Sequence, residues 1–209
     1  MSGMMPSRAM ETMVRRAAGS PFIVGMDEVG RGAWAGPMVA AAVAIPLGAR
    51  IKGVRDSKVL SEEQREEVAR AIHLSAAVWS YGVVSHEEID RMGLTEANRM
   101  AFERAILGVR EPVRHALVDG KYRFQISAPA TFITDGDRSE YLIAAASILA
   151  KVFRDRLMRA AHSLLPEYGF ARHKGYGTEE HQRALRQNGM TSFHRKSFCM
   201  DELRISNKE

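Results

Sequence analysis

Residues 21–46 read PFIVGMDEVGRGAWAGPMVAAAVAIP. Two short apolar runs, residues 21–28 and 38–45, stand on either side of a glycine-rich segment. Runs of this length that are bounded by glycine and proline are typical of buried β-strands. The first run ends at two carboxylates, Asp27 and Glu28. The stretch therefore predicts two paired strands, with acidic side chains where the first strand ends.

Outward from this stretch, strand and helix patterns follow one another. A charged helix is predicted over residues 61–74, where the letters SEEQ match a capping box. An alternating segment at 77–85 predicts a third strand, and two further short strands are expected at 115–118 and 131–134. Helical patterns cover residues 95–107, 139–165 and 178–188, the last closed by Gly189. The order predicts a mixed α/β protein without internal repeats.

The composition excludes several classes of protein. The chain has 209 residues, 45% hydrophobic and 26% charged, which is ordinary for one globular domain. No apolar run reaches the roughly 18 residues of a membrane span, and the N-terminal segment lacks the apolar core of a secretory signal. The single cysteine, Cys199, excludes an internal disulfide and a cysteine-rich zinc site. We expect a protein of the cytoplasm that does not enter membranes.

Basic residues gather in the last quarter of the chain. The formal net charge is +5, and residues 151–197 contain ten Lys or Arg against four Asp or Glu. Four histidines and three aromatic residues interleave with this charge: His162, His173, His181, His194, Tyr168, Phe170 and Tyr176. A solvated basic face is one interpretation of the charge alone. The interleaved rings favour phosphate binding with some stacking, hence a nucleic-acid partner.

Three carboxylates occupy positions that are typical of ligand-binding groups. Asp27, Glu28 and Asp119 each follow a strand-like run and precede a glycine or a glycine-rich turn, where open α/β sheets place ligand-binding groups. Asp27 and Glu28 can share a site only if the strand twists or frays, because adjacent strand residues point to opposite faces. Oxygen ligands without cysteine favour Mg²⁺ or Mn²⁺ over zinc. A turn-forming role is the alternative for Asp119.

Two other features have competing interpretations. Gly30-Arg31-Gly32 resembles a dinucleotide loop, but the two preceding negative charges would repel a pyrophosphate, and a strand follows instead of a helix. Backbone N–H groups there suit a single phosphate or a sugar hydroxyl, and a simple tight turn is the alternative. Asp155 follows Lys151 by one helical turn, so spacing alone favours a salt bridge with Lys151 or Arg159.

Several ordered motifs resemble the bacterial ribonuclease HII family (type 2 ribonuclease H). They are DEVGRG (27–32) followed by AGP (35–37), DSKVLS (56–61), VDG (118–120), AAASILAKVFRD (144–155), HKGYGT (173–178) and HRKSF (194–198). The resemblance implies a ribonuclease H-like α/β fold with a five-stranded mixed sheet flanked by helices and a helical C-terminal region. It implies that Asp27, Glu28, Asp119 and Asp155 bind Mn²⁺ or Mg²⁺ as the catalytic set. It assigns substrate contacts to Gly30, Arg31, Gly32, Lys174 and Tyr176.

The implied activity is endonucleolytic. Such an enzyme hydrolyses the RNA strand of RNA/DNA hybrids and cuts 5′ of ribonucleotides embedded in duplex DNA, leaving 3′-hydroxyl and 5′-phosphate ends by two-metal hydrolysis. The glycine-rich segment would sense the 2′-hydroxyl, and Tyr176 would stack on the next sugar. A non-catalytic nucleic-acid-binding module and a phosphatase-like metalloenzyme are the competing classes.

Domain boundaries follow from the extent of the resemblance. Residues 1–20 are expected to be an N-terminal extension whose flexibility the sequence leaves open, 21–198 a single catalytic domain and 199–209 a tail. Only about 20 residues precede the domain, so ribonuclease HII is favoured over ribonuclease HIII, which carries an N-terminal substrate-binding domain. A monomer is expected. Lys121 and the segment Asp135-Gly136-Asp137 depart from the common Asn and Lys-Gly-Asp; these departures bear on the substrate contacts near them and not on the implied metal ligands.

Overall fold

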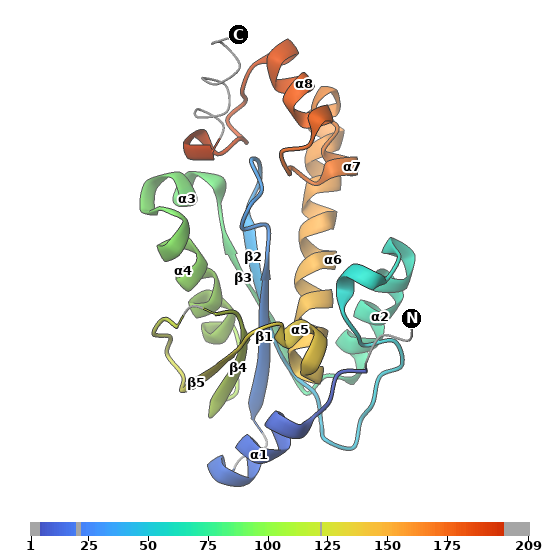
Figure 1. Cartoon of the computed structure of the whole chain (residues 1–209), viewed down its shortest axis with the longest axis vertical. Coiled ribbons are helices and arrows are strands. Elements are labelled where there is room, and N and C mark those ends of the chain that lie inside the picture. The colour runs from blue at the N-terminus through green and yellow to red at the C-terminus, as the bar shows by residue number, and fades with distance from the viewer. Residues whose placement is uncertain (1–4, 20–21, 122, 199–209) are drawn as a thin grey trace.

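A five-stranded mixed sheet forms the centre of the molecule. The computed structural model describes residues 5–19, 22–121 and 123–198. The strands are β1 (Ile23–Val29), β2 (Met38–Ala44), β3 (Val78–Val84), β4 (His115–Asp119) and β5 (Ala130–Ile133), in the spatial order β3-β2-β1-β4-β5. β1, β2 and β3 pair antiparallel, whereas β1, β4 and β5 run parallel (Figure 1). The predicted α/β fold with a five-stranded mixed sheet is confirmed.

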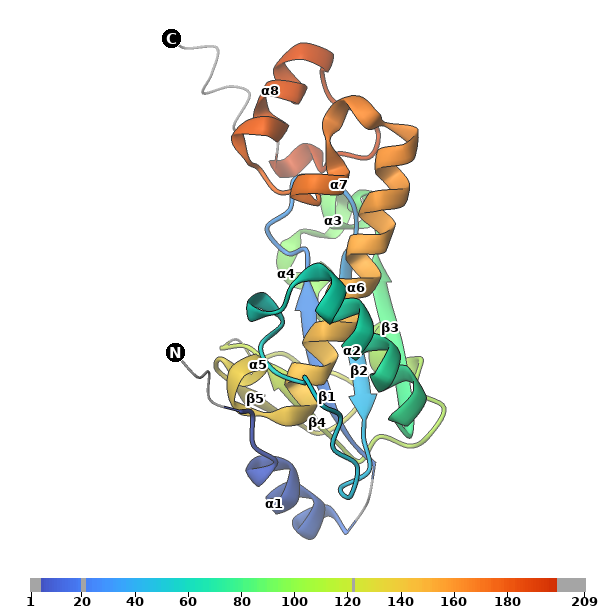
Figure 2. The ribbon, with the colours of Figure 1, turned by 90° about the vertical axis from the view of Figure 1, so that its right-hand side faces the viewer.

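Helices cover both faces of this sheet. α6 (Tyr141–Leu164) crosses one face with α2 (Glu62–Ser75) alongside it, and α4 (Leu94–Leu107) lies on the other face after the short α3 (His86–Met92) (Figures 1 and 2). Alternate residues of β2 enter the two cores: Val39, Ala41 and Val43 the α6 side, Met38 and Ala40 the α4 side. A strand that is buried on both faces has no polar positions, which explains the unbroken run MVAAAVA.

Small residues let α6 lie directly on β1. A Cβ atom placed on Gly25 would lie 2.2 Å from the backbone carbonyl carbon of Leu142. Glycine is therefore the only residue that permits this approach of helix backbone to strand backbone. The approach brings the first turns of α6 against β1, so that Ser147 reaches Asp27 at the acidic end of the strand.

The capping box predicted at Ser61 and the helix predicted to close at Gly189 are confirmed. Ser61 and Gln64 form the capping box that begins α2, and Thr178 caps α8 (Glu179–Asn188), which ends at Gly189. The long helix starts at Tyr141, two residues later than predicted, because residues 136–139 form a separate short helix, α5 (Gly136–Ser139). α3 was not predicted; it begins at a second capping box formed by Ser85 and Glu88.

Part of the predicted N-terminal extension is a helix, α1 (Ala9–Ala18). Its buried Glu11 accepts hydrogen bonds from Arg8 and Arg15, and Arg8 also donates to the carbonyl of Ala49 at 2.7 Å. The backbone N–H of Ser7 donates to Ser139. These contacts hold α1 against the domain. The expected tail, 199–209, and residues 1–4 lie outside the described residues.

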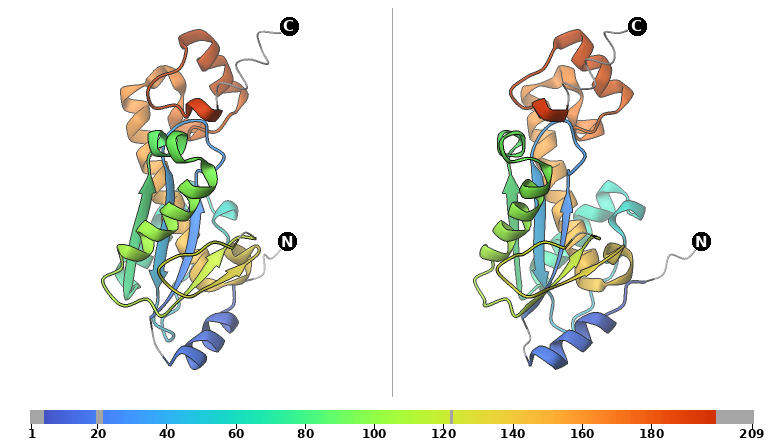
Figure 3. Two further views of the ribbon diagram at one scale, coloured as in Figure 1. Left: turned by 90° about the vertical axis from the view of Figure 1, so that its left-hand side faces the viewer. Right: turned by 60° about the vertical axis from the view of Figure 1, so that its left-hand side comes forward.

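The C-terminal region is helical and sits beyond one end of the sheet. It contains the 3-10 turn η2 (Pro166–Tyr168), the short α7 (Phe170–His173) and α8, all past the end of α6 (Figure 3). Trp34 of the glycine-rich loop donates to Gly175 at 2.8 Å and accepts from Arg195 at 2.7 Å, so the loop is bonded to this region. Among the described residues, no helix is long and apolar enough to cross a membrane.

The rings expected to stack on nucleic acid are mostly core residues. Tyr168 and Phe170 belong to a small apolar cluster with Met158 and Leu185. His173, His181 and His194 are also buried, as are the cations Arg154 and Arg195. The prediction of a basic, ring-bearing surface was wrong for these residues, because buried structural groups contributed much of the sequence signal.

Candidate active site

A pocket lies where the three parallel strands end. β1, β4 and β5 all point their carboxyl ends to the same edge, so residues that follow them meet there. The pocket has a volume of about 370 Å³. Its lining comprises Asp27, Glu28, Val29, Ser57, Lys58, Arg65, Asp119, Asp137, Ser147, Lys151 and Tyr176. Four carboxylates thus border one space: Asp27 and Glu28 near the end of β1, Asp119 at the end of β4, and Asp137 in α5, just after β5.

Asp27 and Glu28 share this pocket although they are neighbours in a strand. The β1–β4 ladder ends at the pair Met26 and Val118, so the β4 side of β1 is uncovered beyond that point. Glu28 can therefore turn its side chain around the free edge. Asp27 faces α6, accepts from the N–H of Glu28 at 2.7 Å and is hydrogen-bonded by the Ser147 hydroxyl. The uncovered edge resolves the conflict that ideal strand alternation predicts.

Asp119 and Asp137 complete the group of carboxylates. Asp119 ends β4, and one of its oxygens accepts from the backbone N–H of Gly136 at 2.7 Å. This bond holds the turn after β5 close to β4, and the next residue, Asp137, is buried beside it. Asp137 is not among the site residues that the sequence predicts, because its segment departs from the family motif. Its position after the third parallel strand was the signal that could have identified it.

A lysine neutralises part of this charge. Lys58, from the 3-10 turn η1 (Ser57–Val59), pairs with Asp137 at 2.7 Å. In the part of the chain that the structure describes, no three acidic, imidazole or thiol groups converge into a ready-made ion site. Repulsion between ionised carboxylates favours such a spread arrangement until a cation joins them. Hard oxygen donors without sulfur are the ligands that Mg²⁺ and Mn²⁺ prefer, so these residues fit a divalent metal.

The electrostatics of the pocket also call for positive charge. Burial, and then the neighbouring charges of Glu28 and Asp119, raise the pKa of Asp27 well above its usual value. Burial and the Asp119 charge raise the pKa of Glu28 to about 7. Burial and the Asp137 charge raise the pKa of Asp119. Each shift reflects the cost of holding negative charges together away from water, a cost that a bound cation offsets.

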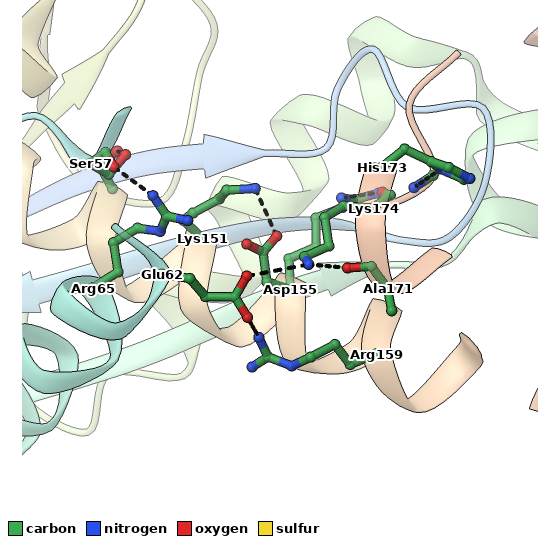
Figure 4. A network of polar contacts seen from close by, with 12 residues as sticks. Ser57, Glu62, Arg65, Lys151, Asp155, Arg159, Ala171, His173 and Lys174 are labelled. Carbon is green, nitrogen blue, oxygen red and sulfur yellow. Dashed lines mark hydrogen bonds and ion pairs between the residues drawn. The ribbon is translucent and has the colours of Figure 1, made fainter. Parts of the chain in front are cut away.

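The structure does not bring Asp155 into the pocket lining. Its carboxylate accepts from the Lys151 ammonium at 2.7 Å, and it lies one turn of α6 beyond Lys151 (Figure 4). The side chain is buried. The salt bridge that spacing favours is present. Asp155 therefore holds Lys151, which does line the pocket, rather than bordering that space itself.

Two buried arginines hold the glycine-rich loop through hydrogen bonds to its backbone carbonyls. Gly30 has φ +87°, and a Cβ atom there would lie 2.2 Å from Nε of Arg154. Arg154 is fully buried and donates to the carbonyls of Pro37, Lys174 and Ala35 at 2.9, 2.9 and 3.1 Å. Arg195 donates to the carbonyl of Arg31 at 2.9 Å. The loop that carries Gly30, Arg31 and Gly32 is thus held in one conformation beside the acidic end of β1.

Tyr176 and Lys174 lie on the same turn but differ in exposure. Tyr176 lines the pocket, with the Arg154 guanidinium 5.4 Å from its ring centre. Lys174 is buried, and its ammonium donates to the carbonyl of Ala171 and lies 3.5 Å from a Glu62 oxygen (Figure 4). The structure therefore brings Tyr176 to the carboxylates and turns the Lys174 ammonium towards α2.

Comparison with known proteins shows the family. A sequence profile of the family Ribonuclease HII matches residues 24–201. The ribonuclease HII of Dichelobacter nodosus is 44% identical over 178 residues, which cover 85% of this chain and 94% of that protein. That of Geobacillus kaustophilus is 45% identical over 183 residues, covering 88% and 70%. The chain belongs to the ribonuclease HII family.

Solved structures agree with this membership. The ribonuclease HII in the PCNA complex from Archaeoglobus fulgidus superposes with a TM-score of 0.73 at 27% identity, covering 85% of this chain and 94% of that one. A ribonuclease HIII, Bst-RNase HIII in complex with Mn²⁺, shares the fold with a TM-score of 0.66 at 22% identity, covering 83% and 65%. As a member of the ribonuclease HII family, the chain is a hydrolase, an endonuclease of the ribonuclease H class.

The raised pKa values predict a stability gain from neutralising this ribonuclease HII pocket. In metal-free buffer at pH 8, Asp119→Asn should raise the free energy of unfolding by roughly 1 kcal/mol, the scale of relieved charge repulsion. Because the pKa values of Asp119 and Glu28 are both raised, the penalty is present while both carboxylates are ionised and is lost as the pH falls through the Glu28 pKa of about 7 towards the ordinary carboxylate range. The gain should therefore shrink as the pH falls.

Denaturant unfolding in EDTA across this pH range provides the measurement. Glu88→Gln is the control of opposite sign, because the Arg104 guanidinium lowers the pKa of Glu88 to about 2. That variant should lose stability at pH 8. A loss of stability in Asp119→Asn as well would contradict the electrostatic interpretation of the pocket.

Proposed function

We propose that this enzyme hydrolyses the RNA strand of RNA/DNA hybrids and cuts 5′ of single ribonucleotides in duplex DNA, leaving 3′-hydroxyl and 5′-phosphate ends. We assign metal binding to Asp27, Glu28, Asp119 and Asp137, with Mn²⁺ or Mg²⁺ as cofactor. The observation that carries this function is the convergence of these four carboxylates, from β1, β4 and the helix that follows β5, on one pocket beside the glycine-rich loop.

The protein's part in the chemistry is to place charge. A bound pair of divalent ions would supply the positive charge that activates a water and stabilises the leaving 3′ oxygen. Asp27 is held by the Ser147 hydroxyl and Asp119 by the Gly136 N–H, so these two carboxylates are fixed before substrate arrives. The Lys58 side chain is largely exposed and forms an ion pair with Asp137. If a metal bound the Asp137 carboxylate, the Lys58 ammonium would be free to pair with a substrate phosphate.

Substrate selection is assigned to the loop and the facing tyrosine. Gly32 is exposed, and a Cβ atom placed on it would meet nothing within 4 Å, so a sugar hydroxyl can approach its backbone closely. Arg154 and Arg195 keep that backbone rigid, which preserves the direction of its N–H groups. The 2′-hydroxyl is what distinguishes RNA from DNA at a given position. A rigid backbone sensor beside the carboxylates suits a cut defined by one ribonucleotide.

Three labelled duplexes test the function. One contains a single ribonucleotide in DNA, one is an RNA/DNA hybrid and one is DNA only, each incubated with Mn²⁺ and, separately, with Mg²⁺. We expect cleavage of the first two, with 5′-phosphate products, and none of the third. Cleavage of the DNA-only duplex, or equal products in EDTA, would contradict the proposal. We also propose that the enzyme works in the cytoplasm as a monomer, and sedimentation of the purified protein tests its oligomeric state.

Tyr176→Ala should alter specificity more than overall activity. If the ring stacks on the sugar after the ribonucleotide, its loss removes about 1 to 3 kcal/mol of transition-state stabilisation on the single-ribonucleotide duplex, the energy of stacking one base on an aromatic side chain. The value of kcat/KM on that duplex falls accordingly. A long RNA tract never offers deoxyribose at that step, so cleavage there should fall less. The measurement is the ratio of kcat/KM on the two substrates. Equal losses on both would reduce Tyr176 to a support of its loop.

A further inference from the structure

Two buried histidines lie directly beneath the Tyr176 turn. His181 is on α8, and His194 follows α8 in the chain; their side chains are 0% and 1% exposed. Neither touches the pocket that holds the carboxylates. Burial first of all lowers the pKa of each to about 4, so both rings are neutral at the pH of the cell. A neutral imidazole has one donor and one acceptor nitrogen, which gives a hydrogen-bonded chain a direction.

The backbone fixes that direction. The N–H of Thr191 donates to Nδ1 of His194 at 3.0 Å, so the proton of His194 sits on Nε2. Nε2 of His194 is 3.1 Å from Nε2 of His181, which must therefore accept. The proton of His181 then sits on Nδ1, 3.0 Å from the carbonyl oxygen of Tyr176. A single chain of donors runs from Thr191 through both rings to the backbone of Tyr176.

His173 supports this chain from the side. Its ring stacks on that of His181 with centres 4.5 Å apart and planes 13° from parallel. Nδ1 of His173 accepts from the N–H of Gly175 at 3.2 Å, and Nε2 donates to the carbonyl of Tyr168 at 2.6 Å. Both nitrogens of all three rings are therefore occupied, and stacking prevents the His181 ring from rotating away from Tyr176.

The turn around Tyr176 lies between two glycines and pairs with Ala33 of the glycine-rich loop. Gly175 has φ +83°, and the backbone on either side has no side chain of its own to pack. Local bonds run from Tyr176 N–H to His173 and from Thr178 N–H to Tyr176, and Trp34 and Arg154 donate from distant segments to the carbonyls of Gly175 and Lys174. The histidine chain adds a separate connection on the opposite side of the sequence, because it joins the carbonyl of Tyr176 to α8 and to the segment that contains His194 and Arg195.

We propose that His181 and His194 are positioning residues that aim the Tyr176 ring at the substrate by holding its backbone carbonyl, and that they thereby set the preference for a ribonucleotide followed by DNA. This inference rests on the proposed role of Tyr176. The histidines touch no reacting atom. Their effect is on which substrate is cut well, not on the metal-binding carboxylates.

Amide substitutions separate the two bonds of each ring. The side-chain amide of asparagine lies near the Nδ1 position of histidine and that of glutamine near the Nε2 position, and either its N–H₂ or its oxygen can face the partner. His181→Asn should keep the bond to Tyr176, whereas His181→Gln keeps a partner for His194 and loses that bond. We expect His181→Asn to retain the wild-type ratio of kcat/KM on the single-ribonucleotide duplex to that on the long RNA tract. His181→Gln should lower the ratio about fivefold or more, the stacking scale expressed as a rate.

Glutamine and asparagine substitutions of His194 provide a second, independent pair of variants. His194→Gln retains a donor to His181 and should keep the ratio, whereas His194→Asn retains only the Thr191 bond and should lower it. Adding Tyr176→Ala to His181→Gln should lower the ratio no further, because both changes remove the same contact. Denaturant unfolding of every variant identifies any that fails to fold. In that case the Asn and Gln variants of the other histidine provide the test.

The outcomes are distinct. Equal ratios in the Asn and Gln variants, or equal losses on both substrates, would overturn the inference and leave the histidines as core residues. Additive losses in the double variant would also overturn it. A wild-type enzyme that shows no difference between the substrates, or that loses none of it in Tyr176→Ala, would instead contradict the proposed role of Tyr176.

Discussion

Asp119→Asn should remove nearly all cleavage while leaving the protein folded. The amide keeps an oxygen that accepts from Gly136, so the turn after β5 is preserved. It loses the negative charge that a divalent metal requires. Metal-dependent charge stabilisation is worth several kcal/mol and each 1.4 kcal/mol is tenfold in rate, so we expect kcat/KM to fall by about 10³-fold or more. The measurement is Mn²⁺-dependent cleavage of the single-ribonucleotide duplex.

A matched neutralisation outside the pocket provides the control. Glu111 is exposed in the loop before β4, and Glu111→Gln changes the net charge by the same amount. It should cleave at the wild-type rate. A stable Asp119→Asn protein that retains most of its activity would show that the pocket is not where the reaction takes place.

Gly25→Ala should destabilise the protein strongly, although it adds a single methyl group. The added Cβ would lie 2.2 Å from the backbone carbon and 2.4 Å from the carbonyl oxygen of Leu142. Neither β1 nor α6 can give way, because both are buried in the centre of the fold. Overpacking of this kind costs about 3 kcal/mol or more. Denaturant unfolding measures it, and metal affinity should fall too because Asp27 lies two residues further along β1.

Gly48→Ala is the matched control for this substitution. A Cβ atom there meets nothing within 4 Å, and the residue is exposed in a turn after β2. Its unfolding free energy should stay within about 0.5 kcal/mol of wild type. Equal stability of the two variants would mean that α6 does not rest on β1 at so short a distance.

Local signals in the sequence predicted the framework well. The apolar runs around residues 21–46 became β1 and β2, and the capping box at Ser61 became the start of α2. These features depend on neighbours in the chain, which a sequence displays directly. The sequence did not predict α1, because the contacts that hold this helix are with distant residues: Arg8 donates to Ala49, and Ser7 donates to Ser139.

The metal-binding assignment needed three-dimensional information that motifs lack. Asp137 sits after the third parallel strand, and the rule that drew attention to Asp27 and Asp119 applies to it equally. A family motif drew attention to Asp155 instead. The sequence alone does not distinguish an aspartate that pairs with a lysine one helical turn away from an aspartate that binds a metal. Nor does it distinguish the buried Lys174, which lies near Glu62, from a lysine that contacts substrate.

Titration of Mn²⁺ into metal-free protein, followed by calorimetry, tests most directly which carboxylates form the metal site. The comparison is between Asp137→Asn and Asp155→Asn, which remove the same charge 18 residues apart in the sequence. We predict that Asp137→Asn weakens Mn²⁺ binding by more than about 100-fold, beyond the 10- to 100-fold typical of residues that only support a ligand. Asp155→Asn should bind with an affinity close to that of wild type. Full affinity in Asp137→Asn together with lost affinity in Asp155→Asn would contradict this assignment of the metal site.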